Sequence, residues 1–367
     1  MSLRRVGLGL LAPVAALLFA TIVSSLVLWA SGNDPLSTYE AMYEYGTRNR
    51  SIVLMLNSAI PLYLSACAVA VGFKMGLFNI GVEGQYRLSV VVAAAYASWV
   101  SLPAPLHVLS VILVSMAVGA GWASIAGVLK ATRGVHEVIS TIMLNFIATG
   151  FAAWLLANFF RDKTSDTLTI KTEEIPASGR IPHLNGWLEA IGIELEGNLQ
   201  GFLLGAILVG VLFYVVVWRT RFGYELRATG LNPFAAQASG VSSKRMIVQA
   251  MLLSGGIAGL VGITQLLGFF GRYTLDFPTG LGFTGIGIAL LGRNHPVGMA
   301  LGALLFSFLS SSARILDLKD VPKEIVDIMQ AVILLSVVVA YEVVRRMITA
   351  AEVRAAAEAQ ERMEMAA

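Results

Sequence analysis

Long apolar stretches alternate with short polar segments along almost the whole chain of 367 residues. Most of these stretches approach or exceed the roughly 20 residues that a helix needs to cross the hydrocarbon core of a bilayer. We therefore expect an all-α polytopic membrane protein. The pattern predicts about ten transmembrane helices, at residues 6–30, 51–72, 86–102, 106–129, 138–160, 200–218, 246–267, 280–292, 296–316 and 325–344.

Two of the stretches, 86–102 and 280–292, are short for a span. They predict broken or re-entrant segments, which survive at membrane depth only where protein or a cavity surrounds them. The glycine-rich runs 76–85 and 280–292 lie in the two halves of the chain and predict an internal repeat. Paired, glycine-interrupted segments of this kind point to a transport site near the membrane midplane.

The composition supports this fold class and narrows the function. Apolar residues make up 56% of the chain, charged residues 13%, and the mean hydropathy is +0.74, which excludes a soluble domain. A net charge of +3 gives no reason to expect a nucleic-acid partner. We expect one transmembrane domain at residues 1–345 and a cytoplasmic tail at 346–367.

Basic residues gather in alternate polar segments. With the N-terminus in the cytoplasm, the inside segments hold most of the 26 basic residues, including Arg87 at the start of the stretch 86–102. The positive-inside rule then predicts that both termini and the segment 219–245 are cytoplasmic, and that 161–199 lies outside. The first apolar stretch is too long for a signal peptide and lacks a cleavage site, so we expect an uncleaved helix.

Polar residues inside the apolar stretches are candidates for a solute path. Glu83 follows Asn79 by four residues, and Asn145 follows Thr141 by four, so each pair shares a helix face. Glu83 either faces the path or caps a nearby helix N-terminus, and the second pair either lines the path or forms interhelical hydrogen bonds. The candidate translocation path comprises Asn79, Glu83, Gln85, Thr141, Asn145, Phe283 and Thr284.

The basic segment 227–240 is a candidate contact surface. Asn232 and Pro233 predict the start of a short helix, and Gly240 predicts its end. Such a helix suits docking into a groove of a cytoplasmic partner, and the alternative is a loop helix lying on lipid headgroups. The residues expected to matter for coupling are Gly230, Asn232, Pro233, Ala235, Ala236 and Gly240.

Enzyme motifs are missing from the sequence. It contains no P-loop, no G-x-S-x-G and no H-E-x-x-H, and its four histidines show no metal-ligand spacing. The run Gly280-x-Gly282-x-x-Gly285 lies in an apolar stretch, where close helix packing is the expected role. Gly255 and Gly259 form a further small-residue pair. We expect no enzymatic activity, metal or cofactor in this chain.

Four segments carry a resemblance to a known family: GLFNIGVEGQ at 76–85, HEVISTIMLNFIATG at 136–150, RATGLNPFAAQASG at 227–240 and GFTGIGIALLGRNHPVG at 282–298. They resemble permease subunits of bacterial ABC importers. The superfamily is that of sugar and branched-chain amino acid permeases, in its nucleoside branch, which is linked to basic membrane lipoproteins.

The resemblance implies an importer in the bacterial inner membrane. It would combine this permease, a second identical or related permease, cytoplasmic ATPases that use the ATP, and an extracytoplasmic solute-binding lipoprotein. The segment 227–240 would be the coupling helix. The solute would be a nucleoside, with a simple sugar as the second choice.

Three other functions compete with this interpretation. An ion-coupled secondary transporter would need acid or histidine relays in several helices, a membrane enzyme would need clustered nucleophiles or metal ligands, and a channel would need no ATP. The acidic segment 161–199 either docks the solute-binding protein or is a solvated loop.

Overall fold

The computed structural model describes residues 18–163, 169–319, 321–322, 324–337, 339–340, 343 and 346. The chain divides into two compact units. One lies within Met1–Gly46 and Ser312–Ala367, and the other is Thr47–Ser311. Each unit is built from helices, and within the described ranges the only extended pairings are three isolated β-bridges.

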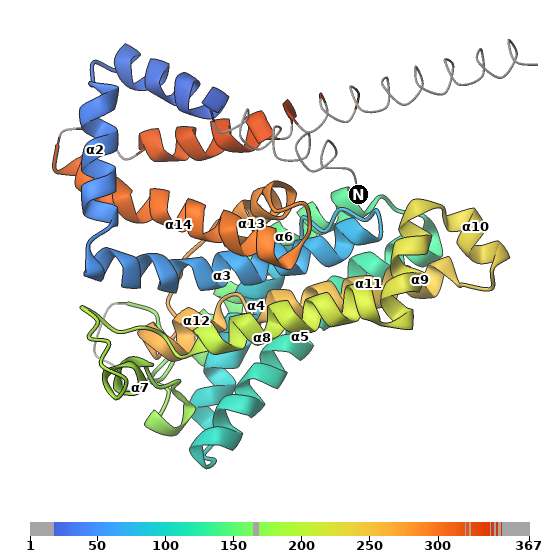
Figure 1. Cartoon of the computed structure of the whole chain (residues 1–367). Helices are drawn as coiled ribbons and strands as arrows, with labels where there is room; N and C mark the ends of the chain where they lie inside the picture. Colours follow the sequence, from blue (N-terminus) through green and yellow to red (C-terminus); the bar gives the residue numbers. More distant parts are fainter. Residues whose placement is uncertain are drawn as a thin grey trace, which may run out of the picture. The chain divides into compact units, whose positions relative to one another are not determined.

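The second unit holds most of the helices (Figure 1). Short π-helical segments continue α6, α8 and α12, at Leu156–Phe160, Val215–Arg219 and Leu266–Phe270. In chain order the helices are α3 (Asn49–Lys74), α4 (Val82–Trp99), α5 (Ala104–Arg133), α6 (Glu137–Leu155), α7 (Asn185–Glu189), α8 (Phe202–Tyr214), α9 (Arg221–Leu231), α10 (Pro233–Ala238), α11 (Ser243–Gly259), α12 (Ile263–Gln265), α13 (Leu281–Leu291) and α14 (Pro296–Asp317), which ends in the first unit.

Six helices of the described chain are long and apolar enough to cross a membrane. They are Asn49–Lys74, Ala104–Arg133, Glu137–Phe160, Phe202–Arg219, Ser243–Phe270 and Pro296–Asp317. The all-α, membrane-type prediction is thus confirmed, whereas the count of ten crossings is not.

The two stretches expected to be broken or re-entrant, 86–102 and 280–292, are not among these six helices. The stretch 280–292 is α13, whose 11 residues span only about 16 Å, half of a bilayer core. The stretch 86–102 belongs to α4, which begins earlier, at Val82. The first and last stretches, 6–30 and 325–344, lie partly outside the described residues.

Helix α3 is the centre of the second unit. Every residue from 64 to 72 is buried, which is typical of an apolar helix enclosed by others. Helix α13 packs along α3, and α11 contacts both α3 and α5.

Helices α5 and α11 approach closely through glycines. A methyl group on Gly119 would overlap the carbonyl oxygen of Gly255, and one on Gly259 would overlap that of Ser115. The Ser115 hydroxyl donates to the Gly259 carbonyl at 2.7 Å. The expected packing role of Gly255 and Gly259 is confirmed.

The polar segment before α8 is folded onto the chain that precedes α13. Lys171 pairs with Thr274 in a β-bridge, and Arg272 contacts Glu174 at 2.5 Å. Glu174 also pairs with Arg180. This segment and α7 lie at one end of α8, and α9 and α10 follow its other end (Figure 1).

The described part of the first unit contains the apolar helix Leu18–Ala30 and α2 (Pro35–Gly46). The carboxylate of Asp34 accepts from the backbone N–H of Ser37 at 2.9 Å and so caps the start of α2. The hydrogen bonds from Ser37 lower the pKa of this carboxyl group. The Ser312 hydroxyl donates to the carbonyl of Met42 at 3.2 Å.

Candidate functional site

The carboxylate of Glu83 caps the first turn of α13. One oxygen accepts from the backbone N–H of Gly280 at 2.8 Å and the other from that of Gly282 at 2.9 Å. The hydroxyl of Tyr86 donates to the first oxygen at 3.0 Å. A buried negative charge at a helix N-terminus is stabilised by the N–H groups and by the helix dipole. These contacts match the capping interpretation of Glu83.

The start of α13 needs glycine because it touches two other helices. A methyl group on Gly282 would overlap the backbone nitrogen of Glu83, and one on Gly285 would overlap the hydroxyl of Ser65 in α3. Gly280 has a φ of 84°, which favours glycine. Gly282 and Gly285 are therefore packing residues, as expected, whereas Gly280 serves the backbone turn before α13.

Asn79 forms the central hydrogen bonds of the non-helical break at residues 75–81, between α3 and α4. Its amide donates to the Ser254 hydroxyl at 2.8 Å and to Gln85 Oε1 at 3.1 Å. Its oxygen accepts from the backbone N–H of Gly81 and from Gln85 Nε2, both at 3.0 Å. Ser254 in turn donates to the carbonyl of Ala68 at 2.6 Å. The break is thereby tied to α3, α4 and α11.

Asn145 attaches α6 to the same break. Its oxygen accepts from the backbone N–H of Gly84 at 2.8 Å, and its amide donates to the carbonyl of Ile80 at 2.9 Å. These are the interhelical hydrogen bonds that formed the alternative to a path-lining role.

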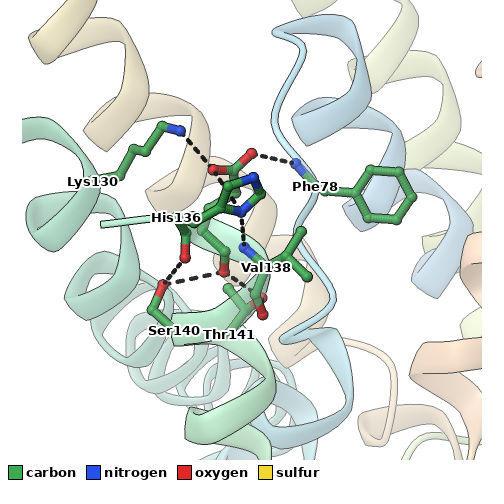
Figure 2. A network of polar contacts seen from close by, with 7 residues as sticks. Phe78, Lys130, His136, Val138, Ser140 and Thr141 are labelled. Atoms are coloured by element: carbon green, nitrogen blue, oxygen red, sulfur yellow. Dashed lines mark hydrogen bonds and ion pairs between the residues drawn. The ribbon is translucent and has the colours of Figure 1, made fainter. Parts of the chain in front are cut away.

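Glu137, the first residue of α6, holds the middle of this break, and Figure 2 shows its partners Lys130 and Phe78. Lys130 donates to Glu137 Oε2 at 2.7 Å, and the backbone N–H of Phe78 donates to Oε1 at 3.5 Å. The hydroxyl of Thr141 donates to the Glu137 carbonyl at 2.7 Å, so this predicted residue serves the same turn. The sequence indicated no role for Glu137 or Lys130, because a charged pair around a helix turn looks like an ordinary loop contact.

The predicted path residues thus form two groups. Asn79, Glu83, Gln85, Thr141 and Asn145 are buried, and their polar side-chain atoms contact protein. The other two lie in the first turn of α13. Phe283 is 52% exposed, and the partly exposed Thr284 donates to the Gly280 carbonyl at 3.1 Å. Their role in solute passage stays a prediction.

Arg87 is a residue whose place the sequence did not indicate. We expected it in a cytoplasmic segment, but it lies in the second turn of α4, one turn after Glu83. The apolar stretch appears to begin at residue 86 only because Glu83 and Gln85 are polar, although the helix has already started. Its guanidinium donates to the Thr149 hydroxyl of α6 at 3.2 Å.

The expected short helix in the segment 227–240 is α10. The side-chain oxygen of Asn232 accepts from the backbone N–H groups of Phe234 and Ala235 at 3.0 and 3.1 Å, and Pro233 is the first helical residue. Gly240, with a φ of 85°, follows the helix end. The capping and stopping roles of these residues are confirmed.

We expected Phe234, Ala235, Ala236 and Ala238 to form one small apolar face, and this prediction is wrong for Ala236. Ala236 is only 5% exposed and faces its own chain, whereas Leu231 and Phe234 are 89% and 85% exposed. Ala235 is exposed as well, so the apolar residues of α10 do not share one face. An outward contact surface would therefore be formed by Leu231 at the end of α9 together with Phe234, Ala235 and Ala238 of α10.

Gly230 places α9 against the end of α3. A side chain there would meet the Lys74 carbonyl oxygen at 2.6 Å and the carbonyl carbon of Met75 at 2.7 Å. Met75 is the first residue of the break in which Asn79 lies, so the segment with α9 and α10 contacts that break.

Two further features bear on binding. An apolar cavity of about 690 Å³ lies between α3, α8 and the start of α14, and none of the predicted path residues lines it. Among the described residues, no group of three or more His, Cys, Asp or Glu side chains is placed to hold a metal ion.

Residues 51–338 match the family described as the permease component of branched-chain amino acid transport systems. This match covers well over half of the chain. The chain belongs to this permease family.

Similar proteins of known name extend the relationship to almost the full length of this permease. The nucleoside ABC transporter permease protein NupB of Lactococcus lactis subsp. cremoris is 32% identical over 335 residues, covering 90% of this chain and 91% of that protein. The guanosine ABC transporter permease protein NupP of Bacillus subtilis is 35% identical over 344 residues, covering 91% and 94%. The glucose ABC transporter permease protein TsgB13 of Haloferax volcanii is 34% identical over 326 residues, covering 88% and 85%.

The family assignment confirms the resemblance found in the sequence. The protein is a multi-pass membrane permease subunit of an ABC transport system, and such a subunit is not itself an enzyme.

Proposed function

We propose that this permease carries nucleosides inward as the membrane subunit of an ABC importer. The observation that carries the proposal is the similarity, over about nine-tenths of the chain, to permeases named for nucleoside and guanosine transport. Phe283, 52% exposed at the start of α13, supplies an aromatic face on which a purine base would stack.

A simple sugar is the competing solute, because the glucose permease is as similar to this chain as the nucleoside permeases are. A sugar offers hydroxyl groups but no aromatic ring. The two solutes therefore make different demands on the path, and a direct transport measurement separates them.

The experiment is uptake by the complete transporter in liposomes, assembled with its ATPase and solute-binding protein. We expect labelled guanosine to accumulate only with ATP on the cytoplasmic side, and an excess of glucose to leave this uptake unchanged. An ionophore that collapses proton and sodium gradients should have no effect, which tests the ion-coupled alternative. ATP-dependent glucose uptake without guanosine uptake would contradict the proposal.

We infer that α10 is the element through which ATP hydrolysis acts on the permease. Phe234 of α10 and the adjacent Leu231, the last residue of α9, are highly exposed, and exposed apolar anchors of this size suit a groove on a partner protein. The partner would be a cytoplasmic ATPase that binds the ATP, so α10 and both chain termini would be cytoplasmic. A second permease would complete the membrane part, surrounded by the lipid bilayer. The acidic segment 161–199 would receive the solute-binding lipoprotein on the outer side.

A short chain of contacts would transmit the movement of α10. It runs from α10 to α9, then from Gly230 to the end of α3 at Lys74 and Met75. It continues through the break at 75–81 to Glu83, which holds the start of α13. A displacement of α9 would thereby reach the half-length helix at the proposed path.

A further inference from the structure

The guanidinium of Arg87 contacts a residue near the middle of a membrane-spanning helix. Its contact, Thr149, is in the membrane-spanning helix Glu137–Phe160. At a rise of 1.5 Å per residue, Thr149 is about 18 Å from the first residue of that span and about 16 Å from the last. Helices α4 and α6 are also joined one turn earlier, where the backbone N–H of Gly84 donates to Asn145.

This charge has no counter-ion in the part of the chain that the structure describes. No carboxylate there forms an ion pair with Arg87, and the carboxylate one turn earlier, Glu83, is occupied by Gly280 and Gly282. The Arg87 side chain is partly exposed rather than enclosed. A guanidinium at mid-membrane is too costly to face lipid tails, so such residues face a water-filled cavity or another polar group.

The neighbouring backbone points to the same conclusion. Arg87 also interacts with the hydroxyl of Tyr273, which belongs to the non-helical segment 271–280. Irregular backbone at membrane depth requires surrounding protein or water, because lipid cannot satisfy its N–H and carbonyl groups. Arg87 thus lies where α4, α6 and this irregular segment meet.

We propose that Arg87 lines the water-filled translocation path and donates hydrogen bonds to the passing solute. This proposal rests on the proposed transport function and names a residue that contacts the solute. The guanidinium carries five N–H donors and no acceptor, so its contacts with Thr149 and Tyr273 leave others free to act. It therefore suits solutes rich in acceptor oxygens and ring nitrogens, such as a purine nucleoside.

Chemical labelling tests the position of Arg87 independently of which solute is carried. In the complete transporter, Cys67→Ala removes the single cysteine of this chain, which is fully buried, and Arg87→Cys then introduces one thiol into it. The matched control is Leu208→Cys, from a side chain that is 57% exposed on the span Phe202–Arg219. Trp187→Cys, in α7, serves as the water-exposed reference.

We expect the anionic, water-soluble reagent sulfonatoethyl methanethiosulfonate to modify Arg87→Cys at least about tenfold faster than Leu208→Cys, because only a hydrated thiolate reacts. Guanosine, or glucose if the Cys67→Ala parent carries glucose instead, should slow the reaction during transport. Equal rates at the two positions would show that lipid or protein covers Arg87 and would overturn the proposal. Rapid labelling that the transported solute does not slow would overturn the solute contact.

Uptake kinetics provide the second measurement. Hydrogen bonds to a charged group correspond to a factor of about 10 to 100 in binding, so Arg87→Gln should raise the KM for the transported solute by that factor. Arg87→Lys, which keeps the charge but loses the planar fork, should show a smaller rise. An unchanged KM in Arg87→Gln would contradict a contact with the solute.

Discussion

Single buried polar groups hold the break at 75–81 and the start of α13 in place. Among them, Glu83 has the strictest requirement for hydrogen-bond partners. Its carboxylate accepts two backbone N–H groups from a helix that comes 197 residues later in the chain. A buried acceptor with so many partners cannot be exchanged for a donor without leaving an N–H group unmatched.

We predict that Glu83→Gln destabilises the permease by about 1.5–3 kcal/mol. The amide NH2 group of the new side chain would face a backbone N–H group at the start of α13, so that two donors meet without an acceptor. The measurement is the unfolding temperature in detergent. It is detected as the temperature at which the buried Cys67 becomes accessible to a thiol-reactive dye. Glu225→Gln is the matched control. Glu225 pairs with the exposed Arg221 at 2.7 Å, and losing such a surface pair costs about 0–1 kcal/mol. Equal effects of the two substitutions would contradict the capping role.

The sequence indicated which polar residues hold the break at 75–81 and the start of α13, but not the groups that they bind. Asn79, Glu83 and Asn145 are conspicuous because polar groups inside apolar runs must find partners. Their partners are mostly backbone groups of distant segments, such as Gly282 for Glu83 and Ile80 for Asn145. Backbone groups are present at every residue, so no sequence pattern distinguishes those that will be used.

At the scale of helices, the closest contact is the one between α5 and α11. It has no room for a side chain at Gly119, whereas the space around Gly121, on the same helix, is open. These two glycines offer a matched pair of substitutions.

We predict that Gly119→Ala destabilises the permease by about 1–3 kcal/mol, because the methyl group would force the two backbones apart. Gly121→Ala should be neutral or should stabilise the protein by up to about 1 kcal/mol, since alanine is the better helix former. Thermal unfolding of both variants under identical conditions provides the comparison. A Gly119→Ala variant as stable as Gly121→Ala would show that the helices are not closely packed at this point.

Helix existence was predictable for the long spans and less so for the interrupted ones. Apolar length alone identifies Asn49–Lys74 and Ala104–Arg133. It misplaces the start of α4, because Glu83 and Gln85 interrupt the apolar run although they are buried inside the protein. Hydropathy reflects the free-energy cost of exposing a side chain to lipid. Glu83 and Gln85 are enclosed by protein, so this cost does not apply to them.

At the scale of the whole transporter, we propose that the exposed surface of α9 and α10 couples ATP hydrolysis to solute movement. Leu231, the last residue of α9, and Phe234 of α10 are two large, exposed apolar side chains on this surface. Replacing Ala236 would be uninformative, since a large side chain at this buried position disturbs the permease itself.

We predict that the double substitution Leu231→Ser and Phe234→Ser leaves the unfolding temperature of the permease unchanged but removes ATPase binding. Anchors of this kind contribute about 2 kcal/mol or more each to an interface, so co-purification of the ATPase and ATP-dependent uptake should both be lost. Trp187→Ser, which removes an equally exposed aromatic side chain from α7, should have neither effect. If the double variant retains the ATPase and normal uptake, α10 is not the coupling element.

The dependence of α13 on Glu83 has a consequence for biogenesis. With 11 residues, α13 is too short to be recognised as a span while the chain emerges from the ribosome. We expect it to reach its place after the helix that carries Glu83, because that carboxylate holds its first turn. A nascent chain that stops after residue 270 would leave the Glu83 carboxylate without its partners Gly280 and Gly282. We therefore expect the second half of this permease to be assembled on a template that the first half provides.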